Sequence, residues 1–274
     1  MNKKVNISYI FLFTFLLIGA FLTLIPYVWM ILSSFKSNME IISLPATILP
    51  KKISFEGYLT IFEEAPFLKW LLNSMFTSSI ITIVSVFSTA LAGYIFAKFK
   101  FKGKKILFLG ILATMMVPFQ VIMIPVYLII ARLGLVNNLG GIIIPFFVSG
   151  FGIFLSKQFI EGLPDAILES GRIDGAGEFR MFWSLILPQI RPILSALAIF
   201  TFMASWNRFL WPLIVLNDIE KMTVPLALVF FNGRYSVNYN IVMSASVLIM
   251  IPVFIVFLIF QKQFIKGLTL TGLK

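Results

Sequence analysis

The sequence predicts an all-α integral membrane protein with six transmembrane helices. Three observations indicate this class: 59% of the 274 residues are hydrophobic, only 12% are charged, and the charges are grouped between long apolar runs. A soluble domain carries about 25% charged residues, roughly twice this share. The two-residue alternation of membrane β-barrels is absent from the sequence. Helices are the remaining form that satisfies every backbone polar group inside lipid.

Each span is predicted from an apolar stretch long enough to cross the hydrocarbon core, which takes about 20 residues. Five stretches of this length contain no charged residue, and the stretch from Pro192 to Leu216 is interrupted only by Arg208. The first stretch is longer than the apolar part of a secretory signal, about 7–15 residues, so we expect it to be retained. The helices are expected at about 8–33, 70–96, 106–131, 139–160, 190–216 and 239–262.

The distribution of Lys and Arg predicts the orientation, because short cytoplasmic loops carry an excess of these residues. With both termini in the cytoplasm, 14 of the 22 basic residues lie inside and 8 lie outside. The densest cluster is AKFKFKGKK at 97–105, which we interpret as an inner loop and not as a nucleic-acid site. This topology puts the segment 164–188 in the cytoplasm and the loops 36–69 and 217–238 outside.

The segment 164–188, called the knob below, contains LESGRIDGAGEFRMFWSLILP, a charged run between two apolar stretches. Pro164 and Asp165 are typical of a helix start. The pair Asp174-Gly175 indicates a turn, with Asp174 able to cap the helix that follows. A second helix with one apolar stripe is predicted by the spacing of Phe179, Phe182, Trp183, Ile186 and Leu187. Such a pair of helices suits docking to another protein, and an interfacial helix resting on lipid is the alternative.

The knob resembles the EAA loop of ABC importer permeases, in which Glu-Ala-Ala precedes a glycine and an Ile-x-Leu-Pro sequence. The matching positions are held by Glu169, Gly175, Leu187 and Pro188. Ser170 and Gly171 replace the alanines, and Leu185 replaces the isoleucine. Gly171 is expected to loosen the first helix by about 0.5–1 kcal/mol relative to Ala. Other stretches are similar to the six-helix subunit of maltose-type sugar importers, among them PYVWMILSSFKS, LAGYIFAKFKFKGKK, WNRFLWPLIVLND and QKQFIKGLTLTGLK.

The resemblance implies a type I (MetI-like) ABC importer permease fold, with 1–274 as one domain whose core covers about 70–262. The knob would couple this chain to a cytoplasmic ABC ATPase dimer through Glu169, Asp174, Gly175, Ala176, Phe179, Phe182, Leu187 and Pro188. The tail after Lys262 would also reach the ATPases. The other implied partners are a second permease subunit, an extracytoplasmic sugar-binding protein that meets the outer loops, and the lipid bilayer of a bacterial or archaeal inner membrane.

Two acidic residues of the knob have alternative roles. Glu169 is expected to pair either with a basic residue of the ATPase or with Arg172, three residues further on. Asp174 is expected to cap the turn, to recognise the partner, or to do both.

The candidates for the substrate path are Asn73, Tyr127, Trp206, Asn207, Arg208 and Trp211. On a continuous helix rising ~1.5 Å per residue, Arg208 lies about 24 Å beyond Pro192, near the outer interface. There it either anchors the helix beside two tryptophans or lines a substrate cavity. The polar candidates, and Gln120, fit helix packing equally well. Pro118 and Pro125 predict kinks in the third span.

The sequence contains no His, no Cys and no Gly-x-x-x-x-Gly-Lys-Ser/Thr motif. We therefore expect no enzyme activity, no cofactor and no metal site in this chain, and another chain must bind any ATP. An ABC permease for another cargo, such as glycerol phosphate, is an alternative, because Arg208 suits an anion. An ion-coupled secondary carrier is less favoured, since such carriers keep an ionisable residue deep in the membrane.

Overall fold

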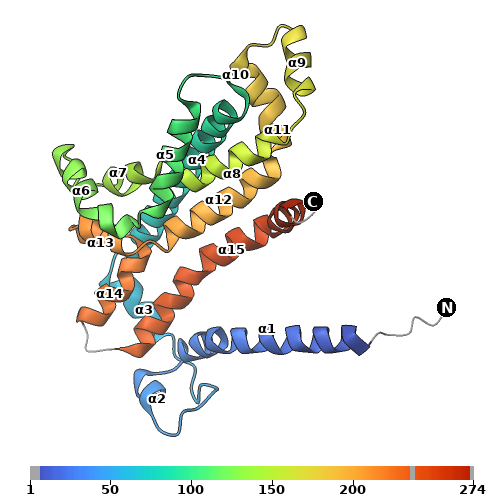
Figure 1. Ribbon diagram of the computed structural model, residues 1–274. Coiled ribbons are helices and arrows are strands. Elements are labelled where there is room, and N and C mark those ends of the chain that lie inside the picture. The colour runs from blue at the N-terminus through green and yellow to red at the C-terminus, as the bar shows by residue number, and fades with distance from the viewer. Residues whose placement is uncertain (1–6, 235–237, 272–274) are drawn as a thin grey trace. The chain divides into compact units, whose positions relative to one another are not determined.

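The protein is described by a computed structural model that covers residues 7–234 and 238–271 (Figure 1). Within these ranges it is helical and contains no β-strand. The chain forms two compact units, the first from residues 1–67 and 227–251 and the second from residues 68–226 and 252–274.

The helices are, in chain order, α1 (Ile7–Ser33), α2 (Asn38–Ile42), α3 (Glu56–Glu64), α4 (Phe67–Lys98), α5 (Lys104–Met116), α6 (Phe119–Arg132), α7 (Leu139–Ile143), η1 (Ile144–Phe146), α8 (Gly150–Glu161), α9 (Ala166–Ile173), α10 (Glu178–Met181), η2 (Phe182–Ile186), α11 (Leu187–Gln189), α12 (Arg191–Trp206), α13 (Leu210–Val215), η3 (Ile219–Lys221), α14 (Val224–Arg234) and α15 (Tyr239–Thr271). Of these, η1 and η3 are 3₁₀-helices and η2 is a π-helical turn.

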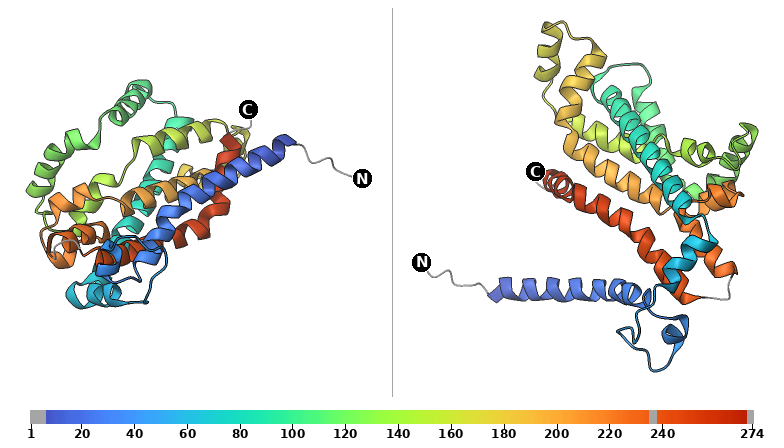
Figure 2. Two further views of the ribbon diagram at one scale, coloured as in Figure 1. Left: turned by 90° about the horizontal axis from the view of Figure 1, so that it is seen from below. Right: turned by 180° about the vertical axis from the view of Figure 1, so that it is seen from behind.

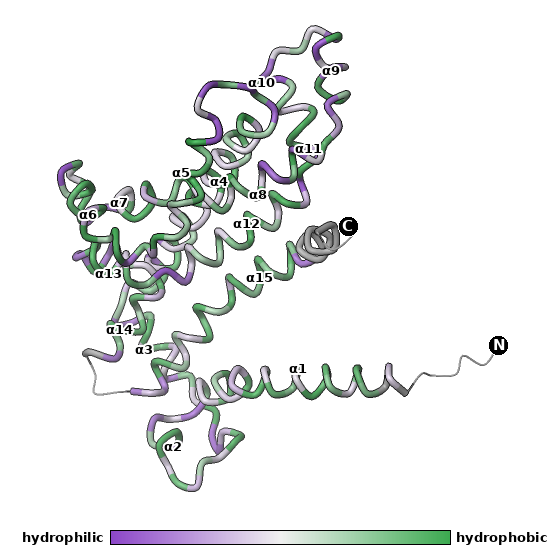
Figure 3. The backbone as a smooth tube through the Cα atoms, in the orientation of Figure 1, coloured by the Kyte–Doolittle hydropathy of each residue, from purple (hydrophilic) through white to green (hydrophobic). Residues whose placement is uncertain are grey.

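Four segments are long and apolar enough to cross a membrane: Phe11–Ser33, Phe67–Lys98, Leu139–Glu161 and Tyr239–Gln261. They agree with four of the predicted spans, and α1 is coloured hydrophobic along most of its length in Figure 3. Two bent helix pairs bring the number to six if each pair counts as one span. The predicted all-α membrane architecture is therefore confirmed. Three of the basic residues counted on the cytoplasmic side, Lys3, Lys4 and Lys274, lie outside the described residues.

The third predicted span is not one kinked helix. It consists of α5 and α6, whose axes differ by 105°. The break follows from Pro118, which disfavours helical backbone in the residue before it. Val117 is accordingly extended, with φ −92° and ψ 115°, and Pro118 is the N-cap residue of α6. Pro125 lies inside α6.

The fifth predicted span also differs, because its helix ends at Trp206 and a new helix begins at Leu210. Pro212 explains this break, since its ring has no N–H to offer and crowds the carbonyl group of Arg208, four residues earlier. Arg208 thus lies between two helices, two residues after the end of α12, and not within one continuous span as expected.

Small residues bring α4 and α8 together in the second unit (Figures 1 and 2). A Cβ atom added at Gly93 would lie 2.5 Å from Cβ of Ser156, and one added at Gly152 would lie 2.8 Å from Cγ2 of Thr89. Thr89 and Gly93 are four residues apart on α4, as Gly152 and Ser156 are on α8, so each helix presents one small-residue stripe. Such stripes allow close backbone packing in membranes, where hydrophobic burial does not drive helix association.

The first unit is built around buried polar groups that follow α1. The side chain of Asn240, at the start of α15, donates hydrogen bonds to the carbonyl groups of Ser34 and Lys36. The hydroxyl groups of Ser34 and Tyr58 are 2.7 Å apart. Lys36 is 1% exposed, and its ammonium group lies 4.7 Å from the ring centre of Trp29. These bonds join the ends of α1 and α3 to the first turn of α15.

Candidate functional site

The knob folds as predicted into two short helical pieces. The first piece is α9, and the second runs continuously through α10, η2 and α11. In Figure 1 the knob forms one end of the second unit. The helical start lies two residues later than expected, since α9 begins at Ala166 with Asp165 as its N-cap residue.

Gly175 makes the turn between the two pieces. Its φ of +75° is a left-handed conformation that glycine adopts without strain. The N–H of Gly175 donates to the carbonyl of Arg172 at 3.0 Å, and the N–H of Ala176 donates to the carbonyl of Gly171 at 2.9 Å. These two bonds define a Schellman motif, which satisfies the last carbonyl groups of α9. The turn predicted from the sequence is confirmed, and its backbone angle favours glycine over other residues.

Asp174 does not cap the second helix, contrary to the prediction. It is the C-cap residue of α9, and its own N–H donates to the carbonyl of Ser170 at 3.0 Å. The N-cap residue of α10 is Gly177, which has no side chain to offer. The Schellman motif explains the difference, because it uses Asp174 to end α9 and leaves three residues before α10 starts at Glu178.

The predicted apolar stripe of the second helix divides into a buried and an exposed half. Phe182 and Ile186 are 0% exposed, and Leu187 is partly buried against the same cluster. Phe179 and Trp183 are 65% and 57% exposed, and their rings stack with centres 6.5 Å apart. The π-helical turn at 182–186 changes the helical register, so residues spaced for one α-helical face no longer share it.

Gly171 permits the two pieces of the knob to pack. A Cβ atom at this position would lie 2.7 Å from Cδ1 of Leu185 and 3.1 Å from Sδ of Met181. Met181 is itself 1% exposed, although the predicted stripe did not include it. Gly171, which was expected to loosen α9, is therefore a contact point between the two pieces.

Two residues of α4 hold the knob, and neither was predicted from the sequence to do so. The hydroxyl of Tyr94 donates to Oε2 of Glu178 at 2.9 Å. The ammonium group of Lys98 donates to the carbonyl of Leu163 at 2.7 Å and to Oδ1 of Asp165 at 2.6 Å. The bond and the charge of Lys98 lower the pKa of the Asp165 carboxyl below its ordinary value. Neither contact has a local sequence signal, because the partners lie 65 or more residues apart.

The local ion pair expected between Glu169 and Arg172 is not formed. The guanidinium group of Arg172 instead donates to Oε1 of Glu178 at 3.2 Å. Glu178 therefore bridges both pieces of the knob and α4. Glu169 is exposed and forms no ion pair with the described residues, so its carboxylate is available to a partner. Pro188 is also exposed, whereas Ala176 packs against the apolar cluster beneath the knob.

Arg208 lines a cavity of about 280 Å³ in the second unit. Its guanidinium carbon lies 3.4 Å from the ring centre of Phe146, and its Nε atom is buried without a hydrogen-bond partner among the described residues. Three hydroxyl side chains share the lining, those of Ser85, Ser149 and Thr201. No acidic residue belongs to this lining. The cavity is thus lined by one cation, three residues with hydroxyl groups and the aromatic residues Phe146, Phe151 and Phe200.

The other substrate-path candidates occupy different positions. Trp206 and Trp211 are each 1% exposed, and Nε1 of Trp211 donates to the carbonyl of Gly141 at 3.2 Å. Asn207 is the C-cap residue of α12, and its side chain donates to the carbonyl of Met203 in that helix, at 3.0 Å. Asn73 donates to the carbonyl groups of Glu220 and Met222, and Tyr127 packs against the apolar cluster around Trp211. Among these six residues, Arg208 alone belongs to the cavity lining.

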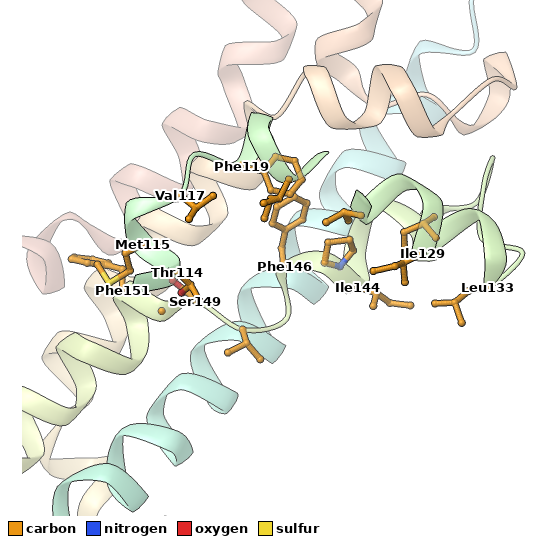
Figure 4. Close-up of a pocket in the computed structure, with 16 residues that line it drawn as sticks. Thr114, Met115, Val117, Phe119, Ile129, Leu133, Ile144, Phe146, Ser149 and Phe151 are labelled. Carbon is orange, nitrogen blue, oxygen red and sulfur yellow. The ribbon is translucent and has the colours of Figure 1, made fainter. Parts of the chain in front are cut away.

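A larger, mostly apolar cavity of about 620 Å³ adjoins the Arg208 cavity (Figure 4). It lies between the bent pair α5–α6 and the residues that join α7 to α8. Phe146, Val148, Ser149 and Phe151 line both cavities. Within the described residues, no group of three or more His, Cys, Asp or Glu side chains could hold a metal ion.

Comparison with known proteins gives a family and close relatives. The family model described as "Binding-protein-dependent transport system inner membrane component" matches residues 89–270. The arabinooligosaccharides transport system permease protein AraQ of Bacillus subtilis is 38% identical over 276 residues, which cover 100% of this chain and 98% of that protein. The diacetylchitobiose uptake system permease protein NgcG of Streptomyces coelicolor is 31% identical, over 90% of this chain and 83% of that protein.

A solved structure has the same fold. It belongs to a bacterial ABC transporter involved in the import of the acidic polysaccharide alginate, and the match has a TM-score of 0.84 at 23% sequence identity. The match covers 96% of this chain and 98% of that chain. Together with the all-helical architecture, this likeness confirms the predicted permease fold.

Proposed function

Because the chain belongs to the family of binding-protein-dependent transport system inner membrane components, we propose that it is the permease subunit of an ATP-driven sugar importer. It forms half of the translocation pathway, and a second permease subunit forms the other half. The relatives named above transport arabinooligosaccharides and diacetylchitobiose, so we propose an oligosaccharide as the cargo. The 38% identity to an arabinooligosaccharide permease favours a sugar over glycerol phosphate. The family favours a binding-protein-dependent system over an ion-coupled carrier.

The observation that carries this proposal is the geometry of the knob. Its glycine turn, its exposed Phe179–Trp183 pair and its free Glu169 carboxylate suit insertion into a cleft of a separate protein. The sequence lacks the glycine-rich phosphate loop, so the ATP site belongs to that partner. We propose a cytoplasmic ATPase dimer as the partner, with both termini of this chain on the same side of the membrane.

The opposite side of the membrane would receive the sugar from a binding protein. The loops 36–69 and 217–238 are the surfaces we propose for that contact. In this arrangement the whole chain, 1–274, acts as one permease domain, and the core at about 70–262 carries the path and the coupling.

We propose the Arg208 cavity as part of the substrate path. Sugars are bound through hydrogen bonds to their hydroxyl groups and through contact of their C–H faces with aromatic rings. Arg208, Ser85, Ser149 and Thr201 supply the polar groups, and Phe146 supplies the ring. The buried Nε atom of Arg208 supports this role, because a buried donor without a partner costs about 1–3 kcal/mol unless a ligand or water pairs with it.

The proposal is tested by purifying the tagged chain in mild detergent and identifying every protein that co-purifies. An ABC ATPase together with a second, related permease is the expected result. Reconstituted vesicles should then import an oligosaccharide only when ATP is inside and the binding protein is outside. A chain that purifies alone or only with itself would contradict the importer assignment.

A further inference from the structure

A third cavity, of about 660 Å³, lies where α4 ends, α5 begins and α8 ends. Three lysines line it, Lys104, Lys105 and Lys157, together with the rings of Phe101 and Phe108. The only acidic residue in this lining is Glu161. The cavity therefore carries a net positive charge, and the transport cycle proposed above makes no use of it.

The three lysines differ in how they are held. The ammonium group of Lys157 lies 4.6 Å from the ring centre of Phe108 and donates to Oε1 of Glu161 at 2.7 Å. The ammonium group of Lys104 donates to the carbonyl groups of Ala97 and Phe99, at 3.4 Å and 3.0 Å. Carbonyl groups orient this cation but do not neutralise it. Lys105 is exposed and forms no hydrogen bond or ion pair with the described residues. Two positive charges thus remain uncompensated at the cavity.

The surface next to these lysines is apolar. None of the residues of α5 is buried, and Ile106, Leu107 and Leu109 are 76%, 57% and 54% exposed. Figure 3 shows the hydrophilic loop before α5 and the hydrophobic colouring of the helix itself. A ligand that fills the cavity and follows α5 must therefore combine a negative head with a long apolar body.

We propose that this cavity is a binding site for an anionic phospholipid, with the phosphate beside Lys104 and Lys105 and the acyl chains along α5. Basic pockets at the membrane surface between helices bind such headgroups. The exposed apolar face of α5 selects a lipid over free phosphate, which would gain nothing from that face. The inference is independent of the cargo and of the coupling role of the knob.

Native mass spectrometry of the full chain, purified in mild detergent with whatever chains accompany it, provides the test. The probes are phosphatidylglycerol, phosphatidylcholine and inorganic phosphate. The charge-neutral double variant K104Q/K105Q should bind phosphatidylglycerol about 30-fold more weakly, since each lysine near a lipid surface contributes roughly a factor of five. Binding of phosphatidylcholine should not change.

The matched control is K100Q/K102Q, which removes two exposed lysines of the same loop that do not line the cavity. It should retain phosphatidylglycerol nearly as well as the natural chain. Equal loss in both double variants would overturn the proposal, because it would mean that the loop attracts anions without a site. Competition by inorganic phosphate at equal concentration would also overturn it. Should K104Q/K105Q fail to insert, K105Q alone, with about a fivefold expected loss, is compared with K102Q.

Discussion

The hydroxyl of Tyr94 on α4 donates a hydrogen bond of 2.9 Å to Oε2 of Glu178, the first residue of α10. The other oxygen of the same carboxylate accepts from Arg172 on α9, at 3.2 Å. Tyr94 is 2% exposed, and its ring packs on Phe182 with centres 5.5 Å apart. A force applied to either piece of the knob therefore reaches α4 through Glu178.

Replacing Tyr94 by Phe should weaken this connection without disturbing the core. The phenyl ring keeps the contact with Phe182, whereas a hydrogen bond to a charged group, worth about 1.5–3 kcal/mol, is lost. We expect normal membrane insertion and partner assembly, with sugar uptake per ATP hydrolysed reduced severalfold. Uptake and ATP hydrolysis are measured together in reconstituted vesicles. Tyr27→Phe, at an exposed position of α1, is the matched control and should leave the ratio unchanged.

Replacing Gly175 by Glu should leave the chain inserted and abolish transport. A Cβ atom at Gly175 meets nothing within 4 Å, so the new side chain points outward from the knob. The left-handed backbone adds a strain of about 1 kcal/mol for any residue other than glycine. Co-purification of the ATPase and uptake are the two measurements.

Two controls separate strain, charge and position at the knob. Gly175→Ala carries the same backbone strain without the charge and should retain most uptake. Gly177→Glu places the same charge two residues away, where φ is −68° and a Cβ atom also meets nothing within 4 Å. Normal uptake by Gly175→Glu would show that the tip of the knob does not dock.

Replacing Gly93 by Ala should destabilise the second unit. The added carbon would lie 2.5 Å from Cβ of Ser156 and 2.9 Å from the backbone N of Lys157, so α4 and α8 must separate. Overpacking of this kind costs about 1–3 kcal/mol. We expect a lower midpoint of thermal unfolding in detergent. Gly110→Ala on α5, where a Cβ atom meets nothing within 4 Å, should not lower it. Equal midpoints for both variants would contradict the close contact.

Replacing Arg208 by Gln should raise the sugar concentration needed for half-maximal uptake. The glutamine keeps a hydrogen-bond donor but loses the charge and the planar contact with Phe146. Arg208→Lys should raise this concentration less than Arg208→Gln does, because lysine keeps the charge but not the planar stacking. Concentration-dependent uptake into vesicles is the measurement, and Arg132→Gln at the exposed end of α6 is the control. Identical concentration dependence for the natural chain, Arg208→Gln and Arg208→Lys would remove Arg208 from the path.

The knob shows how far a local pattern can predict structure. Its turn at Gly175 and its two helical pieces depend on residues at most a few positions apart, and both predictions are confirmed. The apolar stripe was only half right, because a π-helical turn shifts the register between Phe182 and Ile186. No spacing rule anticipates such a turn, which depends on how the helix packs against its neighbours.

The sequence by itself determined the all-α membrane class, because apolar length and charge spacing act one segment at a time. Only the tertiary structure decided that Arg208 lines a cavity, and that Tyr94 and Lys98 hold the knob. Gly93 and Gly171 likewise became identifiable as contact points only when Ser156 and Leu185 were brought beside them. These features depend on pairs of residues far apart in the chain, whose proximity no local pattern of hydropathy or charge encodes.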